Sequence, residues 1–226
     1  MRRERRTIVV PELTFKTLAE EFGADGVLRV ADADVPAGVT HGPTRAFLTR
    51  VGLPRDLRAM GAADLDDGEP WTTLPELYDD FGAGDWTWEQ PDGAEHWYEI
   101  AEFYEGGSIL LDGATGELWW VADDDRPPAR VHSGVDALAY FMYAIRRSTA
   151  RFTHAYTKAL AADQGADDTL AFQLDRYEEE ARRLVADLYT ADPTPFPDGI
   201  GEPWDEDGFA GPWTAILIDV RDGAWS

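Results

Sequence analysis

Apolar residues recur at steps of three and four along the C-terminal half of the chain, which is the period of an amphipathic helix. Two helices are predicted in an extended helical segment around residues 134–191, and each should bury its apolar stripe in the core. The first runs toward Gly165, with a stripe made of Leu138, Phe141, Ile145, Phe152 and Ala159. The second ends at Asp192–Pro193, with a stripe made of Leu170, Leu174, Tyr177, Ala181, Leu184 and Leu188.

Residues that start and stop helices support these predictions and add shorter elements. Ser133 and Asp136 lie three residues apart and resemble a capping box at the start of the first long helix. A short helix is predicted over residues 42–52, because Pro43 suits the first helical position and Gly52 suits the position after the end. Further helices are predicted around residues 15–22 and 212–223.

A two-residue alternation predicts strands in the middle of the chain. It covers residues 97–103 (WYEIAEF), with Tyr98 and Ile100 on one face. Residues 108–112 (SILLD) and 117–121 (ELWWV) flank the connection GATG, a pattern typical of an antiparallel hairpin. Their apolar side chains are contiguous, so we expect cover on both faces of the sheet, by helices or by a partner.

The order of these elements indicates the fold class. Helices come first, then strands, then helices, which predicts an α+β fold with a mostly antiparallel β-sheet flanked by α-helices. We expect one domain over residues 1–226. The longest apolar run near the N-terminus is residues 8–10, and no stretch approaches the roughly 20 apolar residues that span a bilayer. We therefore expect a cytoplasmic protein without membrane contact.

Acidic residues are concentrated in one part of the chain. The sequence has 44 Asp and Glu against 20 Lys and Arg, for a net charge of −24. Residues 59–125 hold nineteen of these acids and no Lys or Arg, and we expect them to form one negative surface. Such a surface repels nucleic acid and anionic membranes and attracts a cationic partner. The alternative is that the acidity serves solubility, although such surfaces usually mix both signs of charge.

The residues show no pattern of catalysis or of metal binding. The chain has no cysteine, and its four histidines do not pair at metal-ligand spacing. The segment from Asp64 to Gly68 is similar to a calcium loop, but its Gly is fifth and its twelfth residue is Pro75, whereas an EF-hand needs Gly sixth and a carboxylate twelfth. No phosphate-binding or nucleophile motif occurs. Carboxylate pairs or an aromatic sugar cleft stay open as alternatives, and we expect no enzyme, metal or cofactor.

Four segments occur together in the order known from one protein family. They are THGPTRAFLTRVGLP (40–54), GSILLDGATGELWWV (107–121), VHSGVDALAYFMYAI (131–145) and PWTAILIDVRDG (212–223). As an ordered set they resemble the SUKH superfamily, and within it the fourth group of SUKH immunity proteins. Where that family commonly has Asn before the serine of the third segment, this chain has His132.

The resemblance implies a function as well as a fold. It implies a non-catalytic immunity protein of a bacterial polymorphic toxin system, which binds and neutralises a cognate toxin, often a nuclease or a deaminase. A toxin that engages nucleic acid tends to be basic, and such a toxin would be attracted by the acidic residues of 59–125, here called the acidic block. The alternatives are an interaction or regulatory module without a toxin, and a carboxylate-based enzyme. The gene beside this one would separate the first two.

The candidate partner-binding residues lie in the acidic block and in its loop-like aromatic positions. We expect aromatic anchors inside an acidic field, although each tryptophan could instead belong to the core. The candidates are Asp64, Asp66, Asp67, Glu69, Trp71, Asp79, Asp80, Asp85, Trp86, Trp88, Asp123, Asp124 and Asp125.

Overall fold

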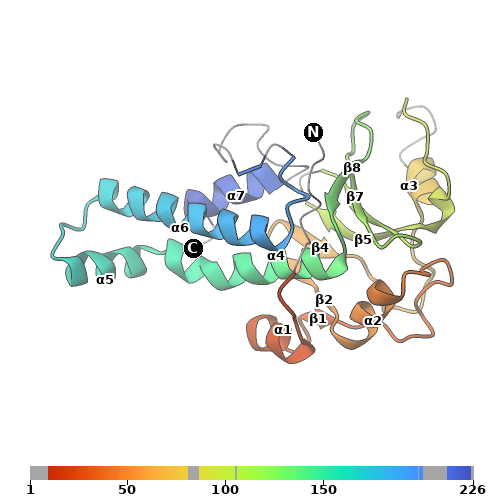
Figure 1. Ribbon diagram of the computed structural model, residues 1–226, viewed down its shortest axis with the longest axis horizontal. Coiled ribbons are helices and arrows are strands. Elements are labelled where there is room, and N and C mark those ends of the chain that lie inside the picture. Colours follow the sequence, from red (N-terminus) through yellow and green to blue (C-terminus); the bar gives the residue numbers. More distant parts are fainter. Residues whose placement is uncertain (1–9, 81–86, 105, 198, 201–212, 225–226) are drawn as a thin grey trace, which may run out of the picture.

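The computed structural model describes residues 10–80, 87–104, 106–197, 199–200 and 213–224 (Figure 1). A sheet with short helices occupies one end of the molecule, and a long helical hairpin projects from it at the other end (Figure 1). The arrangement is an α+β fold with antiparallel sheets, as the order of elements predicted. No helix in the described ranges combines the length and apolar character that crossing a membrane requires.

The main sheet is a six-stranded antiparallel meander in which each strand pairs with the next along the chain. The predicted hairpin is confirmed, since its strands pair from Ser108 with Val121 to Leu111 with Leu118. The strand predicted over 97–103 is confirmed as well. In order, the strands are β3 (Asp56–Leu57), β4 (Met60–Ala62), β5 (Trp97–Phe103), β6 (Ser108–Asp112), β7 (Leu118–Val121) and β8 (Ala129–His132).

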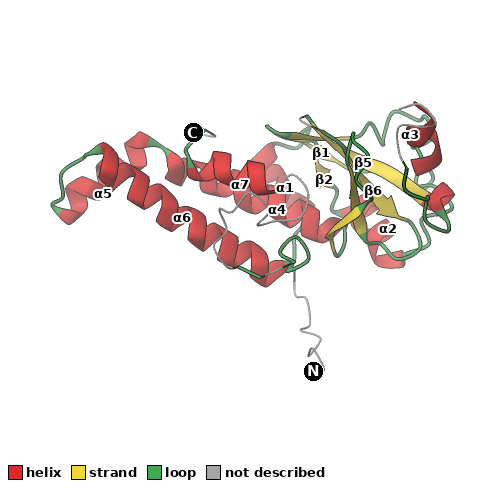
Figure 2. Ribbon diagram, turned by 90° about the horizontal axis from the view of Figure 1, so that it is seen from above, coloured by secondary structure: helices red, strands yellow, loops and turns green. Residues whose placement is uncertain are grey.

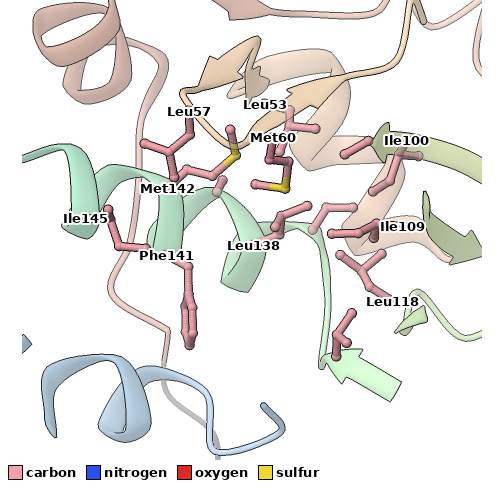
Figure 3. Packing of buried hydrophobic residues seen from close by; sticks show 14 of the residues in the cluster. Leu53, Leu57, Met60, Ile100, Ile109, Leu118, Leu138, Phe141, Met142 and Ile145 are labelled. Atoms are coloured by element: carbon pink, nitrogen blue, oxygen red, sulfur yellow. The ribbon is translucent and has the colours of Figure 1, made fainter. Parts of the chain in front are cut away.

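One face of this sheet packs on the large hydrophobic core. Helix α4 (Val135–Ser148) supplies Leu138, which lies among Ile109 and Leu118 of the hairpin strands (Figure 3). The N-terminal elements complete this core and match the predicted short helices. They are α1 (Phe15–Phe22), β1 (Val27–Leu28), α2 (Gly42–Arg50) and β2 (Leu53–Pro54), with β1 and β2 paired in a small sheet.

The opposite face carries a second, smaller apolar cluster under a helix that the sequence pattern did not predict. This helix is α3 (Leu74–Asp80), and the turn η1 (Ala94–His96) leads from this region into β5. In Figure 2 the strands lie between α3 on one side and α1 and α4 on the other. Cover on both faces is therefore confirmed. The cluster consists of Leu74, Leu77, Ala94, Trp97, Leu110 and Val121.

The long helical segment contains more breaks than its apolar period predicted. The single helix expected toward Gly165 is wrong, because α4 is followed by η2 (Thr149–Phe152) and a separate α5 (His154–Gln164). Thr153 causes the break: its backbone is extended and its side chain caps α5 by accepting from the Tyr156 N–H. The helix predicted before Asp192 is confirmed as α6 (Leu170–Ala191), and the last one is α7 (Trp213–Arg221).

Two further expectations for this segment are wrong. Ser133 does not cap α4, because the N-cap position is taken by Gly134, which has no side-chain oxygen; the Ser133 N–H is bound by Asp192. Leu170 and Leu174 were expected in the core but are 70% and 50% exposed. The first turns of α6 lie beyond the reach of α4 and α7, so only α5 is beside them (Figure 1).

A buried histidine–aspartate pair joins the sheet to the helices. Nδ1 of His132, at the end of β8, lies 3.1 Å from Oδ2 of Asp192, the residue that follows α6, and both side chains are fully buried. The backbone N–H groups of Ser133 and Thr194 also donate to this carboxylate, at 2.9 and 3.0 Å. Burial alone would raise the pKa of Asp192, but the hydrogen bonds and His132 together lower it from 3.8 to about 2.

The hairpin geometry makes a prediction at Gly107. Gly107 has φ +100°, and a Cβ there would overlap the Val121 carbonyl oxygen and lie 2.7 Å from Trp120 Nε1. Gly93 has a similar φ of +80° but open space around it. We expect Gly93→Ala to cost about 1 kcal/mol of unfolding free energy and Gly107→Ala at least about 3 kcal/mol. Urea unfolding measures both, and equal losses would contradict the packing around Gly107.

The buried pair makes a prediction about pH. Because the pKa of Asp192 is about 2 in the folded chain and near 3.8 when unfolded, its contribution is complete above pH 4 and is lost as pH falls toward 2. The stability advantage of the wild type over Asp192→Asn should therefore shrink by about 2 kcal/mol from pH 6 to pH 2. Denaturant unfolding across this range measures it. Asp163→Asn, on the exposed hairpin, is the control. A difference that does not change with pH would refute this assignment.

Candidate functional site

An acidic pocket of about 450 Å³ opens beside β5. It lies between the strands and the loop that runs from β4 to α3. We call it the acidic pocket, and it is lined by Arg55, Gly61, Ala62, Ala63, Asp64, Leu65, Asp67, Glu69, Pro70, Trp71, Thr72, Glu99, Glu102 and Tyr104.

A β-bulge brings two of its carboxylates to the same face of the sheet. Glu99 pairs with Leu110 and Glu102 pairs with Ser108, so the four residues from Glu99 to Glu102 lie opposite only three residues of β6. The extra residue in β5 is Ile100. In a regular strand, residues three apart point to opposite faces. Because of the bulge, both glutamates lie on the face that α3 partly covers.

Glu99 is a buried acid without a counter-charge. Glu99 is only 8% exposed, and its Oε1 accepts a hydrogen bond from the Ser108 hydroxyl. Among the described residues the Ser108 hydroxyl is the only hydrogen-bond donor to this carboxylate, and Glu99 lines the acidic pocket. Burial raises the pKa of Glu99, the Ser108 hydrogen bond partly offsets this, and the nearby Glu102 charge raises it further.

The loop between β4 and α3 supplies the exposed acids of the acidic pocket. Asp64, Asp67 and Glu69 are exposed on it, and Asp67 holds the turn by accepting from the Glu69 N–H at 2.9 Å. Trp71 anchors this loop from inside: its Nε1 donates to the Leu65 carbonyl at 3.2 Å. It is only 5% exposed, so Trp71 is a core tryptophan and not a surface anchor.

The cation at the acidic pocket is already neutralised. Arg55 lines the pocket, but its guanidinium group is paired with Asp66, which lies in the loop between β4 and α3. Tyr104, on the rim and 61% exposed, donates its hydroxyl to Asp56 at 2.9 Å. Among the described residues that line the pocket, no other cationic side chain balances the charge of the remaining carboxylates.

The other predicted partner-binding residues lie elsewhere. Asp79 is exposed on α3, Asp80 ends that helix, and Asp85 and Trp86 lie outside the described residues. Trp88 is half-buried over the smaller apolar cluster, edge-on to Tyr78. The connection from β7 to β8 carries three exposed acids, of which two have partners: Asp124 pairs with Arg126 and Asp125 accepts from Thr87. These acids are Asp123, Asp124 and Asp125.

Sequence reasoning missed Glu99 and Glu102 as parts of the site. Both belong to the acidic block, but nothing in the residue pattern predicts the bulge that places them on the same face. No three acidic or histidine side chains of the described ranges are arranged to hold a metal ion. The charge of the acidic pocket is thus spread around its wall and not focused on one point.

The environment of Glu99 can be tested by titration. We expect its carboxyl to titrate above the ordinary pKa of 4.5 for glutamate, and Ser108→Ala to raise it further, because the donor that stabilises the charged form is lost. Carbon-detected NMR of the side-chain carboxyls measures both. Glu76 is the internal control: Thr73 donates to it and lowers its pKa. A fall in the Glu99 pKa on Ser108→Ala would contradict this arrangement.

Comparison with known proteins identifies the family. The model of the SUKH-4 immunity protein family matches residues 13–208, which includes the sheet, the acidic pocket and the helical hairpin. No match to a curated protein or to a solved structure was found. Because the match spans far more than half of the sequence, the chain belongs to the SUKH-4 immunity protein family.

Proposed function

We propose that this chain, acting as one unit over residues 1–226, neutralises a cognate basic toxin by binding it at the acidic pocket and its loop. The family supports the neutralising role. The observation that carries the choice of surface is Glu99, a buried carboxylate that faces the acidic pocket without a cation to balance it. A positive group of the partner would supply what the chain itself lacks there.

The charge of the chain suggests how such binding would block a toxin. A toxin that acts on nucleic acid needs a cationic surface to hold phosphates, and an acidic loop can compete for that surface. Exposed acids such as Asp64 and Glu69 would speed encounter, because unlike charges steer association. Contacts inside the acidic pocket would slow dissociation, because buried contacts are screened little by salt.

The direct test is protection in cells. The toxin encoded by the gene beside this one should stop growth when expressed alone and should not do so when this chain is co-expressed. The purified chain should form a complex with that toxin and inhibit it. Growth arrest that co-expression does not relieve would contradict the proposal.

A second function is favoured by one observation. Glu99 and Glu102 line one pocket, and a pair of carboxylates is the catalytic group of most glycoside hydrolases. The family favours binding over catalysis. Assays with glycoside substrates separate the two, since a hydrolase would lose its activity on Glu99→Gln.

Association kinetics test the surface. We expect Asp64→Lys with Glu69→Lys to slow association with the toxin several-fold at low salt and to change dissociation little. The matched control is Asp163→Lys with Asp167→Lys, which changes the net charge equally on exposed residues at the end of α5 and in the connection to α6. Stopped-flow mixing at two salt concentrations measures both. Equal slowing by the two pairs would mean that only total charge matters.

A further inference from the structure

Three acidic side chains of the described residues are buried, and they differ in how their charge is balanced. Asp192 is paired with His132, and Glu180 is paired with Arg151 and Arg183. Glu99 has only the Ser108 hydroxyl. A buried carboxylate without a cation is costly to the folded chain, so its presence beside an open pocket points to a ligand that brings the cation.

The shape of the acidic pocket indicates what kind of cation fits. Its volume of about 450 Å³ is in the range of small-molecule sites and far exceeds a bare ion. The carboxylates around it do not converge as metal ligands. An extended organic cation that contacts Glu99 and also meets Glu102, on the same face of the sheet, would fit these features.

Arginine fits these features better than lysine. Its planar guanidinium carries five N–H donors, so it can bond Glu99 and a second carboxylate together. The aromatic ring of Tyr104 on the rim offers a surface on which a guanidinium can stack. Lysine presents a compact, strongly hydrated charge that gains less from such a site.

We propose that the acidic pocket receives one arginine side chain of the toxin, with Glu99 as its main partner and Glu102 as the second. This assignment rests on the proposed function, which it makes specific to one residue type of the partner. Glu99 was not expected as a binding residue from its sequence position, because it lies in a strand between buried apolar residues.

The pocket can be tested without the toxin. The probe is Nα-acetyl-arginine N-methylamide, titrated into the full chain at pH 7.5 and followed by amide NMR. We expect saturable shifts at Ala62, Thr72 and Glu102. The citrulline analogue has the same shape without the charge and should cause none. The lysine analogue should bind more weakly than the arginine probe.

Variants locate the probe. Glu99→Gln keeps an acceptor for Ser108 but removes the charge, and it should weaken the arginine probe about ten-fold. Glu102→Gln is an exposed second variant that leaves the core untouched and should weaken it by less. Asp163→Asn, on the distant hairpin, should leave binding unchanged. Equal binding to Glu99→Gln, equal binding of the lysine analogue, or shifts with citrulline would each overturn the assignment.

The outcome for the acidic pocket is separable from the outcome for the function. If the chain protects cells from the toxin but the arginine probe does not bind, the arginine assignment fails and neutralisation stands. If the probe binds in a Glu99-dependent way but co-expression gives no protection, the arginine site stands and the toxin is not its source. When both hold, Glu99→Gln should also speed dissociation of the toxin complex.

Discussion

The arrangement of this molecule depends on one buried carboxylate. Asp192 follows α6 and accepts hydrogen bonds from the Ser133 and Thr194 N–H groups, and it pairs with His132 at the end of β8. Phe141 of α4 and Trp213 of α7 pack edge-on against the His132 ring. Since a buried carboxylate is stable only while its partners stay in place, this pair fixes α4, α6 and α7 against the same edge of the sheet.

Glu99 is the opposite case on the other side of the sheet. It is buried almost as deeply as Asp192 but lacks a cation, and its pKa is raised where that of Asp192 is lowered. The Ser108 hydroxyl stabilises the carboxylate in the folded chain by donating a hydrogen bond to it. Departures of this kind from the rules of stability concentrate at functional sites, where binding supplies the missing interaction.

Steering and recognition are carried by different residues in this picture. The exposed acids of the loop lie at the mouth of the acidic pocket and act through long-range charge, which salt screens. Glu99 is buried in the wall of the acidic pocket and acts only on a group that enters, with Glu102 exposed on the same face of the sheet. Helix α3 and the smaller apolar cluster cover another part of this face of the sheet. The acidic pocket opens on the same face, beside β5.

Local chemistry along the sequence determined most of the elements, the family and the sign of the charge, but not α3 or the break between α4 and α5. Alternation with glycines at both ends of GATG specified the hairpin, and proline and glycine specified the ends of α2. Three features were decided only by tertiary contacts: the bulge at Ile100, the burial of Trp71 and the exposure of Leu170. Period and propensity define the faces of an isolated element. Which face becomes covered, and where a strand shifts its register, depends on partners distant in the sequence, and the acidic pocket is made by those partners.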